Sequence, residues 1–136
     1  MTSQTKRTGL YLASRSSDFK HFIVGILKKG RIRSQYMNIL TSSESMKIYA
    51  SAFTSELVDP INNYQVLEQI GDMTGNKFII SYMYSRFPQL NCTEGVKVVA
   101  RLRINYGAKQ SFSNIALKLG FWKFISATVD SRQRHM

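Results

Sequence analysis

Apolar side chains recur every three or four positions along most of this chain, which is the spacing of one face of an α-helix. The segments that show it are 18–29, 44–53, 63–87, 93–106 and 111–119. Only 2 prolines and 8 glycines interrupt the chain, so few places remain for the tight turns of an all-β protein. The pattern predicts an all-α fold.

Polar residues mark the ends of these segments. Asp18 can cap the first helix, and Gly30 is suited to end it. Residues 41–44, Thr-Ser-Ser-Glu, have the spacing of a capping box that opens the second helix after a basic linker. Asp59-Pro60 breaks the chain, and Pro88 ends the longest segment, the expected central helix. A last apolar stretch over 121–125 is expected to lie in the core.

Composition sets the number of domains. A chain of 136 residues with 43% hydrophobic residues is long enough to bury one core. We expect a disordered, basic Ser/Thr-rich tail over residues 1–17 and one helical domain over 18–136. A single cysteine excludes an intrachain disulfide, two histidines make a structural zinc site unfavourable, and no apolar run reaches the roughly 18 residues of a membrane span. These features are typical of an intracellular protein, with the cytoplasm as the expected compartment and an organelle as the alternative.

The charge of the chain indicates what kind of partner it binds. The net charge is +11, which indicates a polyanion such as nucleic acid. Residues 1–43 hold eight basic side chains and one acid, residues 44–76 hold five acids and one lysine, and residues 77–136 hold ten basic side chains and two acids. An acidic region between basic flanks is how a metal-dependent nuclease could be organised, although a chance cluster on a solvated helix gives the same pattern.

Three polar residues of the central segment share one helical face. Gln65, Glu68 and Asp72 stand at positions i, i+3 and i+7, and two carboxylates one turn apart can share a hard cation. From the spacing alone, a solvated surface remains the alternative. Gly71 and Gly75 each cost a helix about 1 kcal/mol relative to alanine, so we expect a close contact or a function to require them.

Several ordered motifs resemble the ribonuclease III family. Residues 67–72 read LEQIGD, similar to the L-E-x-[LI]-G-D core of its signature helix. Residues 82–88, YMYSRFP, look like the end of that helix, and residues 94–95 like the start of the next one. Leu102-Arg103 and the stretch SFSNIALKLG over 111–120 continue the resemblance, which covers about residues 40–127. It implies an all-α endonuclease domain that cleaves double-stranded RNA.

The resemblance also assigns roles. Glu68 and Asp72 would be Mg²⁺ (or Mn²⁺) ligands, with Gln65 assisting through hydrogen bonds. A homodimer through the signature helix is implied too, but Gln69 stands where the family usually has a phenylalanine that anchors the partner subunit. Candidate contacts to the RNA backbone, with a solvated basic face as the alternative, are Lys28, Lys29, Arg31, Arg33, Arg101, Arg103 and Lys109.

The family needs a second acidic pair after the segment matched by residues 121–127, and the sequence up to Met136 contains no such motif; Asp130 is a lone carboxylate. We therefore expect either a fragment of a longer enzyme or a catalytically inactive relative that binds RNA or builds a ribonucleoprotein. A third reading is a helix-turn-helix DNA-binding protein, because residues 111–120 resemble the first helix and turn of that motif. It is disfavoured by the apolar residues that follow.

Overall fold

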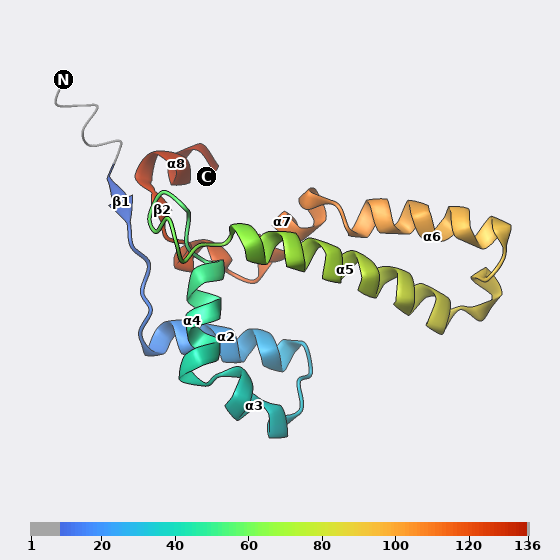
Figure 1. Ribbon diagram of the computed structural model, residues 1–136, viewed down its shortest axis with the longest axis horizontal. Coiled ribbons are helices and arrows are strands. Elements are labelled where there is room, and N and C mark those ends of the chain that lie inside the picture. The colour runs from blue at the N-terminus through green and yellow to red at the C-terminus, as the bar shows by residue number, and fades with distance from the viewer. Residues whose placement is uncertain (1–8, 136) are drawn as a thin grey trace. The chain divides into compact units, whose positions relative to one another are not determined.

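The structure, a computed structural model, describes residues 9–135, and most of them are helical (Figure 1). The all-α prediction is confirmed, since the sheet found among these residues is a single pair of two-residue strands. The chain forms two compact units: one combines the chain up to Gln65 with the segment from Phe121 onward, and the other is Val66–Gly120.

The first unit is built from both ends of the chain. Antiparallel strands β1 and β2 pair Leu10 with Thr128 and Tyr11 with Ala127. The elements of this unit are β1 (Leu10–Tyr11), α2 (Ser17–Lys29), α3 (Ser34–Leu40), α4 (Ser43–Ala52), the 3-10 helix η2 (Phe121–Phe124), β2 (Ala127–Thr128) and α8 (Val129–His135).

Aromatic rings form the core of the first unit. Phe19 of α2 is 1% exposed and packs edge-on against Phe53 at a centroid distance of 5.5 Å. Phe22 stacks on Phe124 at 4.5 Å, and Phe121 contacts Phe53 at 5.0 Å. The prediction that the apolar stretch 121–125 lies in the core is confirmed for Phe124, which is buried, and for Phe121 and Ile125, which pack against the core; Trp122 is partly buried outside this cluster. This core fixes η2 against α2 and α4, although about 100 residues of sequence separate η2 from α2.

Residues 9–17 differ from the predicted tail. They hold β1 and the start of α2, and the side chain of Arg15 is half-buried among backbone carbonyls. The physical reason is that this segment pairs through its backbone with β2, and backbone pairing leaves little trace in composition. Residues 1–8 of the predicted tail lie outside the described residues.

The predicted helix ends are close to the observed ones. Asp18 lies in the first turn of α2, where hydrogen bonds from Ser14 and Ser16 lower the pKa of its carboxyl group below the usual range. The cap of α4 is Ser42, whose hydroxyl accepts from the Ser45 amide, one residue later than the predicted capping box. The predicted linker between the first two helices contains α3, which the sequence pattern did not indicate.

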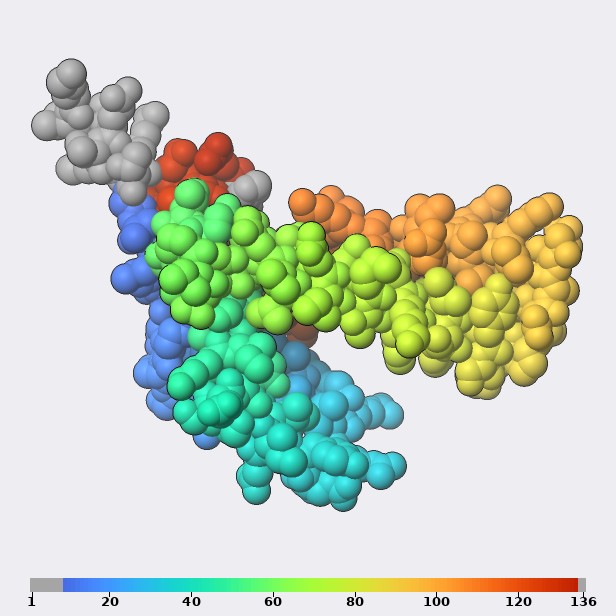
Figure 2. All heavy atoms as spheres, viewed as in Figure 1, coloured from blue at the N-terminus to red at the C-terminus, as the bar shows by residue number. Residues whose placement is uncertain are grey.

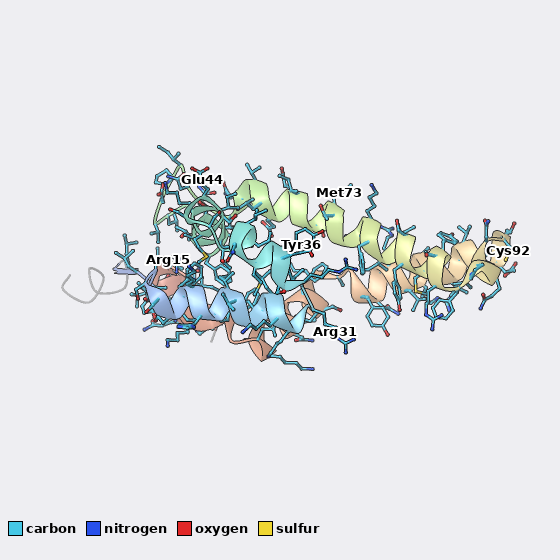
Figure 3. The ribbon with its side chains drawn as sticks, turned by 90° about the horizontal axis from the view of Figure 1, so that it is seen from below. Arg15, Arg31, Tyr36, Glu44, Met73 and Cys92 are labelled. Carbon is cyan, nitrogen blue, oxygen red and sulfur yellow. The ribbon has the colours of Figure 1, made fainter. Side chains whose placement is uncertain are left out.

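The second unit contains most of the central helix α5 (Gln65–Arg86) and returns along α6 (Thr93–Tyr106) after the 3-10 helix η1 (Pro88–Leu90); Figure 2 shows α5 and α6 in space-filling form. α7 (Lys109–Lys118) follows. Cys92 caps α6 at the turn where the chain reverses (Figure 3). The backbone of Gly95 lies so close to the Leu90 carbonyl that a Cβ atom would overlap it.

The chain after α7 does not form a recognition helix over residues 121–125. Gly120 takes a φ of 79°, η2 is four residues long, and Phe124 is buried. Strand β2 follows after two residues. A helix-turn-helix module needs a polar second helix that reaches base edges, so this geometry does not support the DNA-binding reading.

Candidate functional site

The three predicted polar residues lie on one face of α5. Gln65, Glu68 and Asp72 are all exposed, and the helix is continuous between them. The amide of Gln65 donates to Oδ1 of Asn63 at 3.1 Å, which helps to start the helix at this point. The structure therefore presents two carboxylates and one carboxamide, one turn apart, to solvent.

Asp72 has a further partner that the sequence reading missed. Nδ2 of Asn76, one turn later on α5, donates to the backbone carbonyl of Asp72 at 2.7 Å and to its Oδ1 at 3.2 Å. An asparagine four positions after an aspartate has the spacing of a helical side-chain pair. The Asp72–Asn76 contact could therefore have been predicted from that spacing.

The two carboxylates suit a hard cation that keeps much of its water. Mg²⁺ in proteins is commonly held by one or two carboxylates together with water and substrate phosphates. Glu68 and Asp72 supply that number, and neither forms an ion pair among residues 9–135. Within the same residues there is no group of three or more His, Cys, Asp or Glu side chains that could enclose a metal. The donor set fits a cation held in part by a bound phosphate.

The remaining acid near the end of the chain is already paired. Asp130, on α8, lies 3.4 Å from the guanidinium of Arg134.

Four of the predicted RNA contacts gather at the end of α2. Lys28 and Lys29 form its last turn, Arg31 follows with a φ of 58°, and Arg33 caps α3. All four are exposed, and Figure 3 shows Arg31 at this end of the helix. Lys28 and Lys29 also lie where a helix dipole favours positive charge. The result is a compact basic cluster, which we call the α2 basic cluster.

The other three predicted contacts do not share a face. Arg101 and Arg103 stand two positions apart on α6, so their side chains leave the helix on nearly opposite sides. Lys109 begins α7. All three are exposed.

Arg15 is a second residue that the sequence reading missed. Its guanidinium donates to the carbonyls of Phe53 at 3.1 Å and Phe124 at 2.9 Å and to the hydroxyls of Thr54 and Ser126. Burial lowers the pKa of this guanidinium, and no acid pairs with it among the described residues. The role is structural, and the Ser-rich surroundings gave no signal for it.

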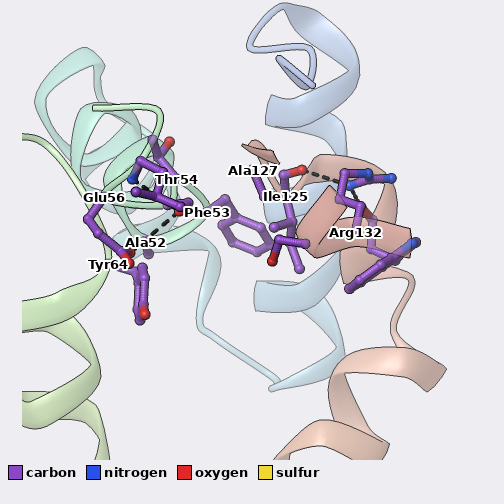
Figure 4. Close-up of a pocket in the computed structure, with 12 residues that line it drawn as sticks. Ala52, Phe53, Thr54, Glu56, Tyr64, Ile125, Ala127 and Arg132 are labelled. Carbon is purple, nitrogen blue, oxygen red and sulfur yellow. Dashed lines mark hydrogen bonds between the residues drawn. The ribbon is translucent and has the colours of Figure 1, made fainter. Parts of the chain in front are cut away.

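A pocket of about 340 Å³ lies in the first unit, outside the predicted site (Figure 4). Arg132 borders it, donates to the carbonyls of Trp122 and Ile125, and lies 3.8 Å from the centroid of the Tyr11 ring. Its walls are formed by Ala52, Phe53, Thr54, Ser55, Glu56, Leu57, Tyr64, Trp122, Ile125, Ala127, Ser131 and Arg132.

Gln69 is exposed on α5, and the expected homodimer through this helix stays a prediction. Over residues 9–135, no helix has the length and apolar character needed to cross a membrane.

Sequence comparison finds relatives among viral and bacterial proteins. A protein of Invertebrate iridescent virus 6, provisionally named ribonuclease 3, is 46% identical over 123 residues, which cover 90% of this chain and 42% of that protein. One of Frog virus 3, also provisionally named ribonuclease 3, is 44% identical over 102 residues, covering 75% and 27%. Ribonuclease 3 of Lactobacillus acidophilus is 32% identical over 101 residues, covering 70% and 41%. The chain thus spans less than half the length of each. No family model matches the chain, nor does a solved structure.

Proposed function

Because this chain is a relative of the ribonuclease III proteins, as its motifs indicate, we propose that it carries the first acidic pair of a divalent-metal-dependent endonuclease site for double-stranded RNA. A match that covers 90% of the chain includes α5, where that pair lies. We propose with it that the substrate is an RNA duplex and that the role is RNA processing.

One observation carries the proposal: Glu68 and Asp72 stand one turn apart on an exposed face of α5. Like charges at this spacing destabilise an isolated helix by a few tenths of a kcal/mol. Glu68 lies in the first turn of α5, where the helix dipole favours an acid, but Asp72 lies beyond that turn. A divalent cation bound by both carboxylates would remove the repulsion between them. The exposed pair therefore supports a cation site, with a solvated acidic surface as the alternative.

The residues of this chain would have different roles at the site. Glu68 and Asp72 would hold the cation, and the Gln65 carboxamide would orient water or a phosphate oxygen by hydrogen bonds without adding charge. A divalent cation bound there supplies an activated water and stabilises the charge that develops during phosphodiester hydrolysis. The α2 basic cluster, Arg101, Arg103 and Lys109 would contact RNA phosphates without reading sequence.

A second candidate is a catalytically inactive relative that binds RNA or serves in a ribonucleoprotein. It is favoured by the absence, among residues 9–135, of a third acid beside Glu68 and Asp72. Both candidates predict binding of duplex RNA, and only the first predicts cleavage.

The test is incubation of a long RNA duplex with the chain and Mg²⁺, with Glu68→Gln and Asp72→Asn beside it. Glu94→Gln is a matched control, because Glu94 is also an exposed helical acid but is paired with Lys97 at 3.7 Å. The nuclease proposal expects cleavage by the chain and by Glu94→Gln and loss of cleavage in both other variants.

Binding of the duplex without cleavage would instead indicate that the chain holds half of a catalytic site, as a fragment of a longer enzyme would, or that it is the inactive RNA-binding relative. Absence of duplex binding at low salt would overturn both candidates. Cleavage that survives both substitutions would show that other residues carry the chemistry.

A further inference from the structure

The side chain of Asn76 is held between an acid and a glycine within the second unit. On one side, Nδ2 lies 2.7 Å from the Asp72 carbonyl oxygen and 3.2 Å from its Oδ1. Both neighbours are oxygens that only accept hydrogen bonds, so the carboxamide must turn its NH₂ group toward Asp72. Asn76 is half-buried while Asp72 is exposed.

Gly107, after the end of α6, fixes the other side of this carboxamide. A Cβ atom on Gly107 would lie 2.5 Å from Oδ1 of Asn76 and 2.7 Å from the carbonyl oxygen of Arg103. The φ of Gly107 is −89°, which any residue can adopt, so the constraint is space and not backbone conformation. Glycine at this position leaves room for the Asn76 carboxamide.

We propose that Asn76 is a positioning residue for the Asp72 carboxylate, and that Gly107 is the neighbour that gives it room. The proposal rests on the function proposed above, in which Asp72 is a cation ligand. The bond from Asn76 engages Oδ1 and leaves Oδ2 open to a cation. A ligating carboxylate that is held by a hydrogen bond loses less side-chain freedom on binding.

A structural role is the competing explanation, because an asparagine that bonds to the carbonyl four residues earlier contributes locally to its helix. Substitutions at Asn76 can distinguish its bond to the Asp72 carbonyl from its bond to the Asp72 carboxylate. In Asn76→Ser, a hydroxyl can still donate to the Asp72 carbonyl but is too short to reach the carboxylate. In Asn76→Gln, the longer carboxamide can again reach an acid four positions away.

The experiment is a titration of the chain with Mn²⁺, followed by electron paramagnetic resonance of the free ion. Asn76→Ser is expected to weaken Mn²⁺ binding about 10-fold, the order found when a residue that orients a metal ligand is removed. Asn76→Gln is expected to bind more tightly than Asn76→Ser, which a structural role would not produce. Thermal unfolding of each variant is measured alongside.

Asn114→Ser is the control, because Asn114 is also a helical asparagine bonded to a residue four positions away, but it is exposed and its Oδ1 accepts from Nε2 of Gln110 at 3.1 Å, so it holds no acid. It is expected to bind Mn²⁺ like the unsubstituted chain. Equal Mn²⁺ binding by Asn76→Ser and the unsubstituted chain, together with loss in Asp72→Asn, would overturn the role of Asn76 alone. No effect of Asp72→Asn, or no Mn²⁺ binding by the unsubstituted chain, would overturn the metal site itself and the role of Asn76 with it.

Discussion

Arg15 shows what a single residue contributes to the first unit. Its guanidinium joins the N-terminal segment to the end of α4 and to the segment after η2, and it lies over the Phe19 ring at 4.7 Å. The acceptors are mostly backbone carbonyls and hydroxyls, which carry no charge pattern that a sequence could display. The sequence alone therefore predicts that this arginine, in a Ser-rich stretch, belongs to a disordered tail.

Replacing Arg15 by lysine is expected to lower the free energy of unfolding by about 1–3 kcal/mol, because an ammonium group cannot serve the same spread of acceptors as a planar guanidinium. The measurement is urea unfolding followed by the fluorescence of Trp122, the single tryptophan, which lies in the same unit. Arg134→Lys is the control, because Arg134 forms an exposed pair with Asp130. Equal destabilisation by both substitutions would contradict the role given to Arg15.

The helices were predicted best where residues in the sequence itself mark their ends. α5 and α6 begin and end within two residues of their expected bounds, because Pro88 and the apolar spacing act locally. α3 was missed because no acid marks its first turn, no basic residue its last, and no side chain in it is buried. β1 and β2 were missed because each exists only through its distant partner.

Two glycines of the second unit are expected to respond oppositely to alanine. Gly95→Ala places a Cβ against the Leu90 carbonyl and should lower the free energy of unfolding by about 1–3 kcal/mol through overpacking. Gly71→Ala meets nothing within 4 Å and should raise it by about 0.5–1 kcal/mol through helix propensity. Thermal unfolding followed by circular dichroism measures both. A Gly71→Ala variant that is stable but cleaves poorly would show that function requires this glycine.

At the scale of the whole molecule, the chain leaves the first unit at Gln65 and returns to it at Phe121. The sequence predicted the apolar character of residues 121–125 but not their partners, since ring contacts between Phe22 and Phe121 follow from tertiary packing. In the candidate site, too, local features could be predicted from the sequence but tertiary contacts could not. Glu68 and Asp72 could be found from spacing and motif, whereas the place of Asn76 against Gly107 depends on the return of α6.

The net charge of +11 predicts that duplex binding weakens as salt rises, and the α2 basic cluster is expected to account for part of that dependence. In the double variant Arg31→Gln/Arg33→Gln, the magnitude of the negative slope of log affinity against log salt should fall by about 1 for each arginine that contacts a phosphate. Fluorescence anisotropy of a labelled RNA duplex over a salt series measures that slope. The control is Lys20→Gln/Lys47→Gln, which removes the same charge from exposed sites on α2 and α4. General electrostatic attraction depends on the total charge, whereas direct phosphate contacts depend on where each charge lies. An equal change in slope for both variants would therefore show that the α2 basic cluster does not contact RNA directly.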